Sequence, residues 1–184
     1  RLEKFAKRYY QLARNKDIDC LVVFPAIVPN NKSNMEYISS YIIDNILYDK
    51  FPKVCFRPRL NSKFLYSRKE FKFMKDPKIQ LDSGRQPLSD LIARSKLVIN
   101  IRYPSTNLLE CLYVDQISVG ILVNDQPTSI VKDYYNYFLE RKILHNDIES
   151  IINHINTIDL NNWWESVILE EKYLNFKNTF AKKV

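Results

Sequence analysis

The sequence predicts an α/β fold: a Rossmann-like, mostly parallel sheet of about five strands flanked by helices, with a helical C-terminal tail over residues 156–184. Short apolar runs rich in β-branched residues alternate with segments of helical periodicity, which is typical of a parallel sheet with right-handed crossovers. Of the 184 residues, 46% are hydrophobic and 27% are charged, as in globular proteins. No repeat or low-complexity linker divides the chain, so we expect a single domain over residues 1–184.

The first half of the chain supplies three expected strands and three expected helices. Apolar residues spaced three and four apart predict the helices, and short apolar runs bounded by turn residues predict the strands. The stretch 64–74 is basic and fits neither pattern. In chain order we expect a helix over 1–16, a strand over 19–25, a helix from Ser33 through Leu47, strands over 53–57 and 78–82, and a helix over 87–94.

The second half continues the alternation and then becomes helical. A β-branched run predicts a fourth strand over 97–101, followed by an amphipathic helix over 106–114 and a fifth strand over 117–123. Beyond it we expect an aromatic-rich helix over 129–142, a helix over 147–155 capped by Asn146, and a last helix over 163–180.

The net charge of +7 is concentrated in residues 50–78. Ten Lys and Arg residues against Glu70 and Asp76 give this segment +8, which leaves −1 for the remainder of the chain. Such a local excess favours an anionic partner near this segment.

Other features of the sequence exclude some classes of site. Only two glycines are present, which excludes a glycine-rich phosphate loop. The three cysteines form no C-x-x-C pair and have no histidine at metal-ligand spacing, so we expect buried thiols, no metal and no other cofactor. No apolar run approaches the ~18 residues of a membrane-spanning helix, and we expect a cytoplasmic protein. Because the chain begins with Arg, we also expect an N-terminal domain that is missing here.

The junction between the fourth strand and its helix is the strongest candidate binding site. An apolar run ends at Ile101, a turn with Pro104 follows, and Ser105 and Thr106 open the helix. Ligands of open α/β sheets bind beyond the carboxyl ends of strands, and the N–H groups at a helix start attract phosphate. We therefore expect Ser105 and Thr106 to bind phosphate, although N-capping of the helix explains the same residues.

Two arginines follow the second strand. Arg57 and Arg59 flank Pro58, and the two-residue period of a strand would place both side chains on one side. A guanidinium group can donate two parallel N–H bonds to a phosphate. We expect both arginines to bind the anion; solvated charges at a strand end are the alternative.

Four further polar residues lie at the same predicted edge. Arg102 and Tyr103 belong to the junction itself and either line the site or face water. Asp82 and Ser83 follow the third strand, where they either contact the ligand or form an ordinary Asp-Ser-Gly turn.

The order and spacing of four segments resemble the C-terminal half of a bacterial family of surface-carbohydrate transferases, of the capsule and lipopolysaccharide type, in the glycosyltransferase-B (GT-B) superfamily. The segments are 56–59, 79–84, 91–99 and 104–110, and the resemblance extends over residues 53–182. Members of that family typically carry Ser-Thr-Thr-x-x-Glu-Ala-Leu after a Val/Ile-rich strand. Here the element reads Ser-Thr-Asn-Leu-Leu-Glu-Cys-Leu.

This resemblance implies a nucleotide-sugar-binding domain. It implies that Ser105 and Thr106 bind the donor phosphate and that the Glu110 carboxylate accepts hydrogen bonds from ribose hydroxyls. It also implies a CMP-linked acidic sugar as donor and a carbohydrate or lipid-linked acceptor. The missing N-terminal half would bind the acceptor and supply the catalytic base, so the catalytic residues are unknown. Asn107 and Cys111 depart from the family's usual Thr and Ala, which bears on the identity of the donor.

Two other functions fit the sequence. Segment 50–78 interleaves its basic residues with aromatic ones, which is the composition of a single-stranded nucleic-acid-binding module, although no nucleic-acid-binding signature accompanies it. The same segment could contact an anionic membrane surface at the inner face of the plasma membrane. The chain could also be a non-catalytic protein-interaction domain. We expect a transferase, with nucleic acid as the less favoured partner. The interleaved aromatic residues are Phe56, Phe64, Tyr66, Phe71 and Phe73.

Overall fold

The computed structural model describes residues 2–27, 32–60, 75–103, 105–122 and 129–180. The strands are β1 (Ile18–Ile27), β2 (Val54–Leu60), β3 (Ile79–Leu81), β4 (Ser95–Tyr103), β5 (Ser118–Leu122) and β6 (Leu144–His145). The helices are α1 (Leu2–Leu12), α2 (Lys32–Asn45), α3 (Leu88–Arg94), α4 (Thr106–Tyr113), α5 (Ser129–Glu140), α6 (Ile148–Thr157), α7 (Leu160–Ile168) and α8 (Glu171–Phe180).

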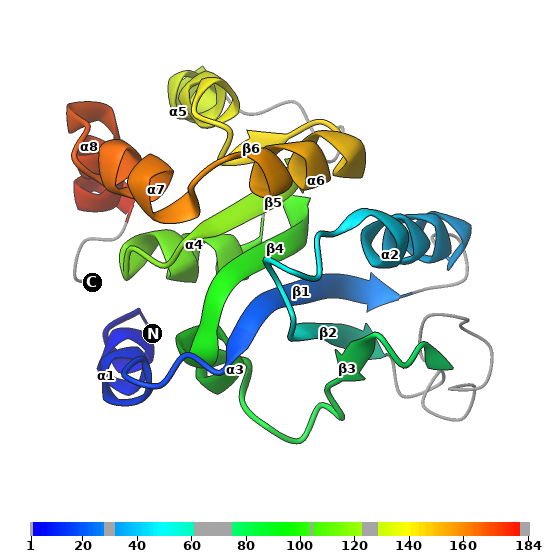
Figure 1. Cartoon of the computed structure of the whole chain (residues 1–184). Coiled ribbons are helices and arrows are strands. Elements are labelled where there is room, and N and C mark those ends of the chain that lie inside the picture. The colour runs from blue at the N-terminus through cyan, green and yellow to red at the C-terminus, as the bar shows by residue number, and fades with distance from the viewer. Residues whose placement is uncertain (1, 28–31, 61–74, 104, 123–128, 181–184) are drawn as a thin grey trace.

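The strands form one sheet in the order β3-β2-β1-β4-β5-β6, and every neighbouring pair is parallel (Figure 1). The predicted α/β class and parallel sheet are therefore confirmed. After β3 the chain returns across the sheet, so β4 pairs with the opposite side of β1 from β2. The strand order thus reverses beside β1, and in open α/β sheets the crevice for a ligand lies at the carboxyl ends of such strands.

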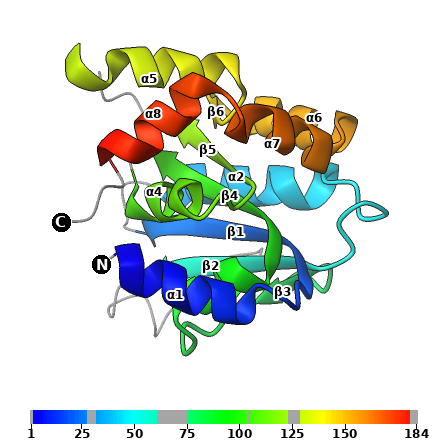
Figure 2. The same cartoon turned by 90° about the vertical axis from the view of Figure 1, so that its left-hand side faces the viewer.

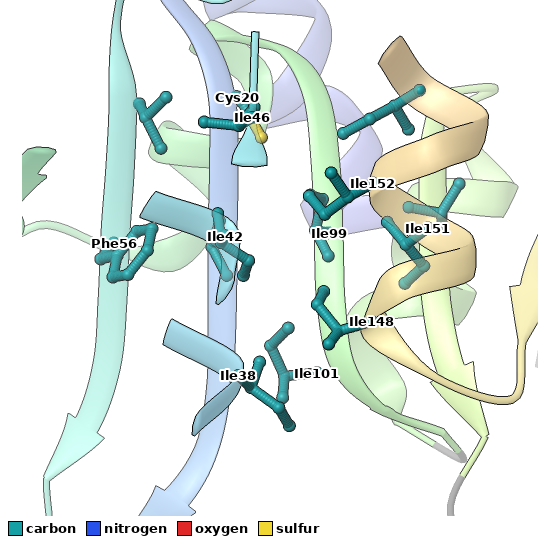
Figure 3. Close-up of a cluster of buried hydrophobic side chains, with 14 of the residues drawn as sticks. Cys20, Ile38, Ile42, Ile46, Phe56, Ile99, Ile101, Ile148, Ile151 and Ile152 are labelled. Atoms are coloured by element: carbon teal, nitrogen blue, oxygen red, sulfur yellow. The ribbon is translucent and has the colours of Figure 1, made fainter. Parts of the chain in front are cut away.

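One face of the sheet is covered by α2 and α6. Along β1, Cys20 and Val22 point to this face, and Leu21 and Val23 point to the opposite one, as the two-residue period of a strand requires. Each isoleucine that α2 and α6 bury contributes about 1.5–3 kcal/mol relative to exposure. Figure 3 shows Ile38, Ile42, Ile148, Ile151 and Ile152 packed over Cys20, Phe56, Ile99 and Ile101.

The opposite face is covered by α1, α3 and α4. In the view of Figure 2, α1 and α4 lie in front of the sheet. Phe5 and Tyr9 of α1, Ile92 of α3 and Cys111 of α4 are buried there against Val98. Since α1 leads directly into β1 and runs antiparallel to it, its first turn lies at the carboxyl ends of the strands.

The helices α7 and α8 dock on the turn between α4 and β5. The Trp164 indole donates to the Asp115 carbonyl at 2.7 Å, and the Tyr173 hydroxyl donates to the Leu112 carbonyl at 2.9 Å. The Lys177 ammonium lies 2.7 Å from the Asp115 carboxylate. Trp164 therefore anchors this helical segment, as expected from its size and its indole N–H group.

Three details differ from the sequence-based expectations. A sixth strand, β6, follows α5, and its two residues are too few to give a periodic pattern. Helix α6 is capped by Asp147, whose carboxylate accepts from the Ser150 N–H at 2.7 Å, rather than by Asn146. The expected helix over 163–180 is two helices, and the first is capped by Asp159.

Within the described ranges, none of the helices combines the length and the apolar character that crossing a bilayer requires.

Candidate functional site

A pocket of about 570 Å³ lies at the carboxyl ends of β1 and β2, beside the point where the strand order reverses. We call it the strand-end pocket. Its walls come from the starts of three helices and from two strand ends: Lys4, Phe5 and Arg8 of α1, Val23 and Phe24 of β1, Arg57 of β2, Pro87, Leu88 and Ser89 at α3, and Asn107 and Glu110 of α4. The pocket lies at the carboxyl edge of the sheet, where open α/β sheets bind ligands, but neither Ser105 nor Thr106 lines it.

Arg57 is held in the strand-end pocket by the turn that follows β3. Its guanidinium group forms an ion pair with Asp82 and donates to the Gln86 carbonyl at 3.0 Å and the Gly84 carbonyl at 3.4 Å. The Arg57 side chain is 17% exposed and that of Asp82 is 7% exposed. Because several bonds fix the guanidinium group, it meets an anion without losing much conformational freedom.

The turn itself is organised by Asp82. Its carboxylate accepts from the Gly84 N–H at 2.8 Å, and Gly84 has a φ of 81°, a left-handed conformation that favours glycine. This arrangement directs the Gly84 carbonyl toward Arg57. Asp82 therefore forms the Asp-Ser-Gly turn and positions Arg57, while Ser83 is exposed on that turn.

Helix α1 adds two cations to the strand-end pocket. Arg8 forms a two-pronged ion pair with Asp90, including a 2.6 Å bond from Nη2 to Oδ2, and the Arg8 guanidinium lowers the pKa of the Asp90 carboxyl. Lys4, one turn earlier on the same helix face, is exposed and has no carboxylate partner in the described part of the chain. Lys4 is thus the cation whose charge is least compensated.

The starts of α1 and α4 both contribute to this pocket. Each helix start carries N–H groups without an intrahelical partner and a partial positive charge. At α4 the Ser105 hydroxyl accepts from the Leu108 N–H at 3.2 Å and so caps the helix. The capping explanation of Ser105 is confirmed, and its hydroxyl proton can still be donated. Phosphate binding by Ser105 remains a prediction.

Glu110 and Thr106 lie on the side of α4 that faces a second, smaller pocket. Glu110 is buried, at 8% exposure, and lines both pockets. Thr106 is exposed and lines only the second pocket. The structure thus brings Arg57 and Glu110 to the strand-end pocket, and places Thr106 next to it.

The remaining predicted ligands either do not line this pocket or lie outside the described residues. Arg102 is exposed and lines neither cavity. The side chains of Arg59 and Tyr103, and the whole of Pro104, lie outside the described residues.

Residues 61–74, which are about half of the basic segment 50–78, also lie outside the described residues. Four of the five aromatic residues of the nucleic-acid alternative lie in this range: Phe64, Tyr66, Phe71 and Phe73. Phe56, the remaining aromatic residue of the nucleic-acid alternative, is fully buried and packs 5.2 Å from Phe24, measured between ring centroids. Phe56 is therefore a core residue and not a stacking platform for bases.

A family model for the LIC12162 family transferase matches residues 30–184, which is most of the chain. The chain belongs to the LIC12162 family of transferases. No curated protein matches this family member by sequence.

Solved structures show the same fold. The wall teichoic acid polymerase TagF superposes with a TM-score of 0.52 at 13% identity, over 97% of this chain and 42% of TagF. The C-terminal domain of LpcC, a glycosyl transferase group 1 family protein from Francisella tularensis, gives 0.52 at 14% identity, over 95% of this chain and 92% of that domain. The fold is that of the C-terminal half of a GT-B transferase, as the sequence resemblance implies. The chain spans less than half of TagF.

Sequence reasoning missed the contribution of α1 to the strand-end pocket. Lys4 and Arg8 lie four residues apart, which places both on one helix face, and that spacing was the available signal. Asn107, which departs from the usual Thr, lines the strand-end pocket, whereas Cys111 is buried against the sheet.

Proposed function

We propose that this chain is the donor-binding half of a glycosyltransferase and that the strand-end pocket holds the phosphate of a nucleotide sugar. The observation that carries this proposal is the convergence of Lys4, Arg8 and Arg57 with the starts of α1 and α4 at the carboxyl ends of β1 and β2. Helix starts and guanidinium groups are the protein's usual means of binding phosphate without a glycine-rich loop. The transferase family and the shared fold support the same function.

The chemistry of glycosyl transfer requires this kind of site. When an acceptor hydroxyl attacks the sugar, the bond to the nucleotide breaks and negative charge develops on the departing phosphate. Cations and N–H groups that are already oriented stabilise that charge in the transition state without further reorganisation. Arg57 fits this role because Asp82 and the 84–86 turn fix it before the ligand arrives. In this proposal the oriented cations and N–H groups, rather than a metal ion, stabilise the leaving group.

We propose a CMP-linked acidic sugar as donor, in agreement with the sequence resemblance. Asp82 and Asp90 compensate the charges of Arg57 and Arg8, so the strand-end pocket has less net positive charge than its three cations suggest. A donor with one phosphate, as in CMP sugars, suits this balance better than a diphosphate. Glu110 accepts hydrogen bonds from the ribose hydroxyls in this scheme, and Ser105 donates one to the phosphate.

The remaining partners belong to the whole transferase. We propose that the rest of the protein binds a carbohydrate or lipid-linked acceptor and supplies the catalytic base. The setting is bacterial surface-polysaccharide synthesis at the cytoplasmic face of the membrane, where the basic segment 50–78 contacts anionic lipid.

Calorimetric titration of the chain with CMP, UDP, GDP and a single-stranded oligonucleotide tests this function. We expect CMP to bind most tightly, and the oligonucleotide to bind weakly or not at all. If no nucleotide binds to the folded protein, the donor-site proposal is wrong and a non-catalytic interaction domain is favoured. If the oligonucleotide binds with steep salt dependence, the nucleic-acid function replaces it.

A further inference from the structure

A second, smaller pocket of about 180 Å³ lies between the start of α1, the outer face of α4 and the end of α8. We call it the apolar pocket. Its walls are Leu2, Leu109, Tyr113, Phe176 and Phe180. Leu109 and Phe180 are 36% and 39% exposed, so apolar surface around this hollow remains in contact with water. Covering that surface with a ligand would be favourable.

The aromatic part of the wall is fixed by its neighbours. The ring centroids of Phe176 and Phe180 lie 5.0 Å apart, and Tyr134 packs edge-on against both at 5.4 and 5.6 Å. Because the rings are held by packing, a planar ring can stack on them without reordering the helix.

The polar residues that line the apolar pocket are Thr106, Glu110 and Lys177. The Thr106 hydroxyl can donate and accept a hydrogen bond. The Lys177 ammonium, which donates to the Asp115 carboxylate at 2.7 Å, belongs to a residue that lines the same pocket. Apolar walls with a few oriented polar groups are typical of a site for a small heterocycle, whereas an acyl chain would need a longer and wholly apolar channel.

The apolar pocket and the strand-end pocket are neighbours, because Glu110 lines both. From one cavity to the other, a ligand would encounter an apolar hollow, then a carboxylate, then cations and helix starts. A nucleotide presents its parts in the same order: a planar base, a ribose with hydroxyl donors, and a phosphate.

We propose that the apolar pocket holds the nucleobase of the donor, stacked against the aromatic rings, while Glu110 binds the ribose. This inference rests on the proposed function, since it requires the phosphate to lie in the strand-end pocket. The small volume favours a single-ring base, that is, a pyrimidine nucleotide. Thr106 thus contacts the base rather than the phosphate.

The test uses the full chain with CMP and ribose 5-phosphate as probes. In saturation-transfer NMR, we expect the cytosine H5 and H6 protons to receive the strongest saturation, because they lie against aromatic side chains. Leu109→Trp fills the apolar pocket, and Phe180→Ala removes one stacking ring. Each should weaken CMP binding by about tenfold or more and leave ribose 5-phosphate binding unchanged. The matched control is Leu174→Trp, since Leu174 is 45% exposed on α8 but does not line the pocket.

The outcomes separate this inference from the proposed function. If CMP binds the unaltered chain but the cytosine protons receive little saturation and Leu109→Trp binds CMP normally, the base does not occupy the apolar pocket and only this inference is overturned. If neither CMP nor ribose 5-phosphate binds the unaltered chain, the phosphate site itself is wrong. Both variants change exposed side chains, and circular dichroism confirms their folding.

Discussion

Replacing Arg57 with alanine should weaken nucleotide binding by about 10- to 150-fold, because a hydrogen bond to a charged group contributes roughly 1.5–3 kcal/mol. The guanidinium group is fixed by Asp82 and by the Gly84 and Gln86 carbonyls, so its contact with a phosphate requires little further ordering. Arg57→Lys keeps the charge but cannot reach all three partners at once. We therefore expect Arg57→Lys to lose part of the affinity and Arg57→Ala to lose most of it.

The assay is calorimetric titration of each variant with CMP at fixed ionic strength. Arg141→Ala is the matched control, because the Arg141 guanidinium also pairs with a carboxylate, that of Glu170 at 2.9 Å, but does not line the strand-end pocket. Arg57→Ala also leaves the Asp82 carboxylate without its cation, and we expect about 1–3 kcal/mol less stability. Unchanged CMP affinity in a folded Arg57→Ala protein would refute the reasoning, and so would an equal loss in the Arg141 variant.

Three further predictions concern the surroundings of the site and the core. Ser105→Ala removes the cap of α4 and should lower the free energy of unfolding by about 1 kcal/mol. Ser105→Asp should retain the cap and repel phosphate. Urea unfolding and CMP titration of both variants separate the capping role from the phosphate-binding role. Burial lowers the pKa of His145 and of His154 to about 4, so both stay neutral in the folded protein while the unfolded chain binds protons below about pH 6.5. The stabilisation from keeping both histidines neutral should therefore be fully present above about pH 6.5. The free energy of unfolding should decrease toward pH 4 by up to about 1.4 kcal/mol per pH unit for each histidine. Urea midpoints that do not change between pH 7 and 5 would contradict this prediction. Gly84→Ala forces a side chain into a φ of 81°, and we expect a loss of about 1–2 kcal/mol in thermal unfolding together with weaker CMP binding.

The sheet could be predicted from the sequence because each long strand is marked locally. The β-branched run at 97–101 and the apolar run at 19–25 are short, bounded by turn residues and separated by helical periodicity. The two-residue strand β6 has no such mark, since its pairing with β5 depends on the rest of the sheet. The break between α7 and α8 at Leu169 and Glu170 contains neither glycine nor proline, so no breaker residue signals it.

The candidate site could be predicted only where its residues follow strand ends. Arg57 could be predicted as a candidate because it follows a short apolar run, and Glu110 because its element resembles the Ser-Thr-Thr-x-x-Glu motif of the family. Lys4 and Arg8 were missed because α1 shows its apolar face most clearly, and its packing against α3 and α4 is a tertiary contact. The hydroxyl of Ser105 accepts an N–H bond within its own helix, which is the capping role that the sequence also indicates, and its binding of phosphate stays a prediction.

The most direct test of the account is a structure of the chain in complex with CMP. We predict that the phosphate lies in the strand-end pocket, with its oxygens within 2.7–3.2 Å of the Arg57 guanidinium group or of N–H groups at the start of α4. A complex in which CMP is bound at another surface and the strand-end pocket stays empty would contradict the account.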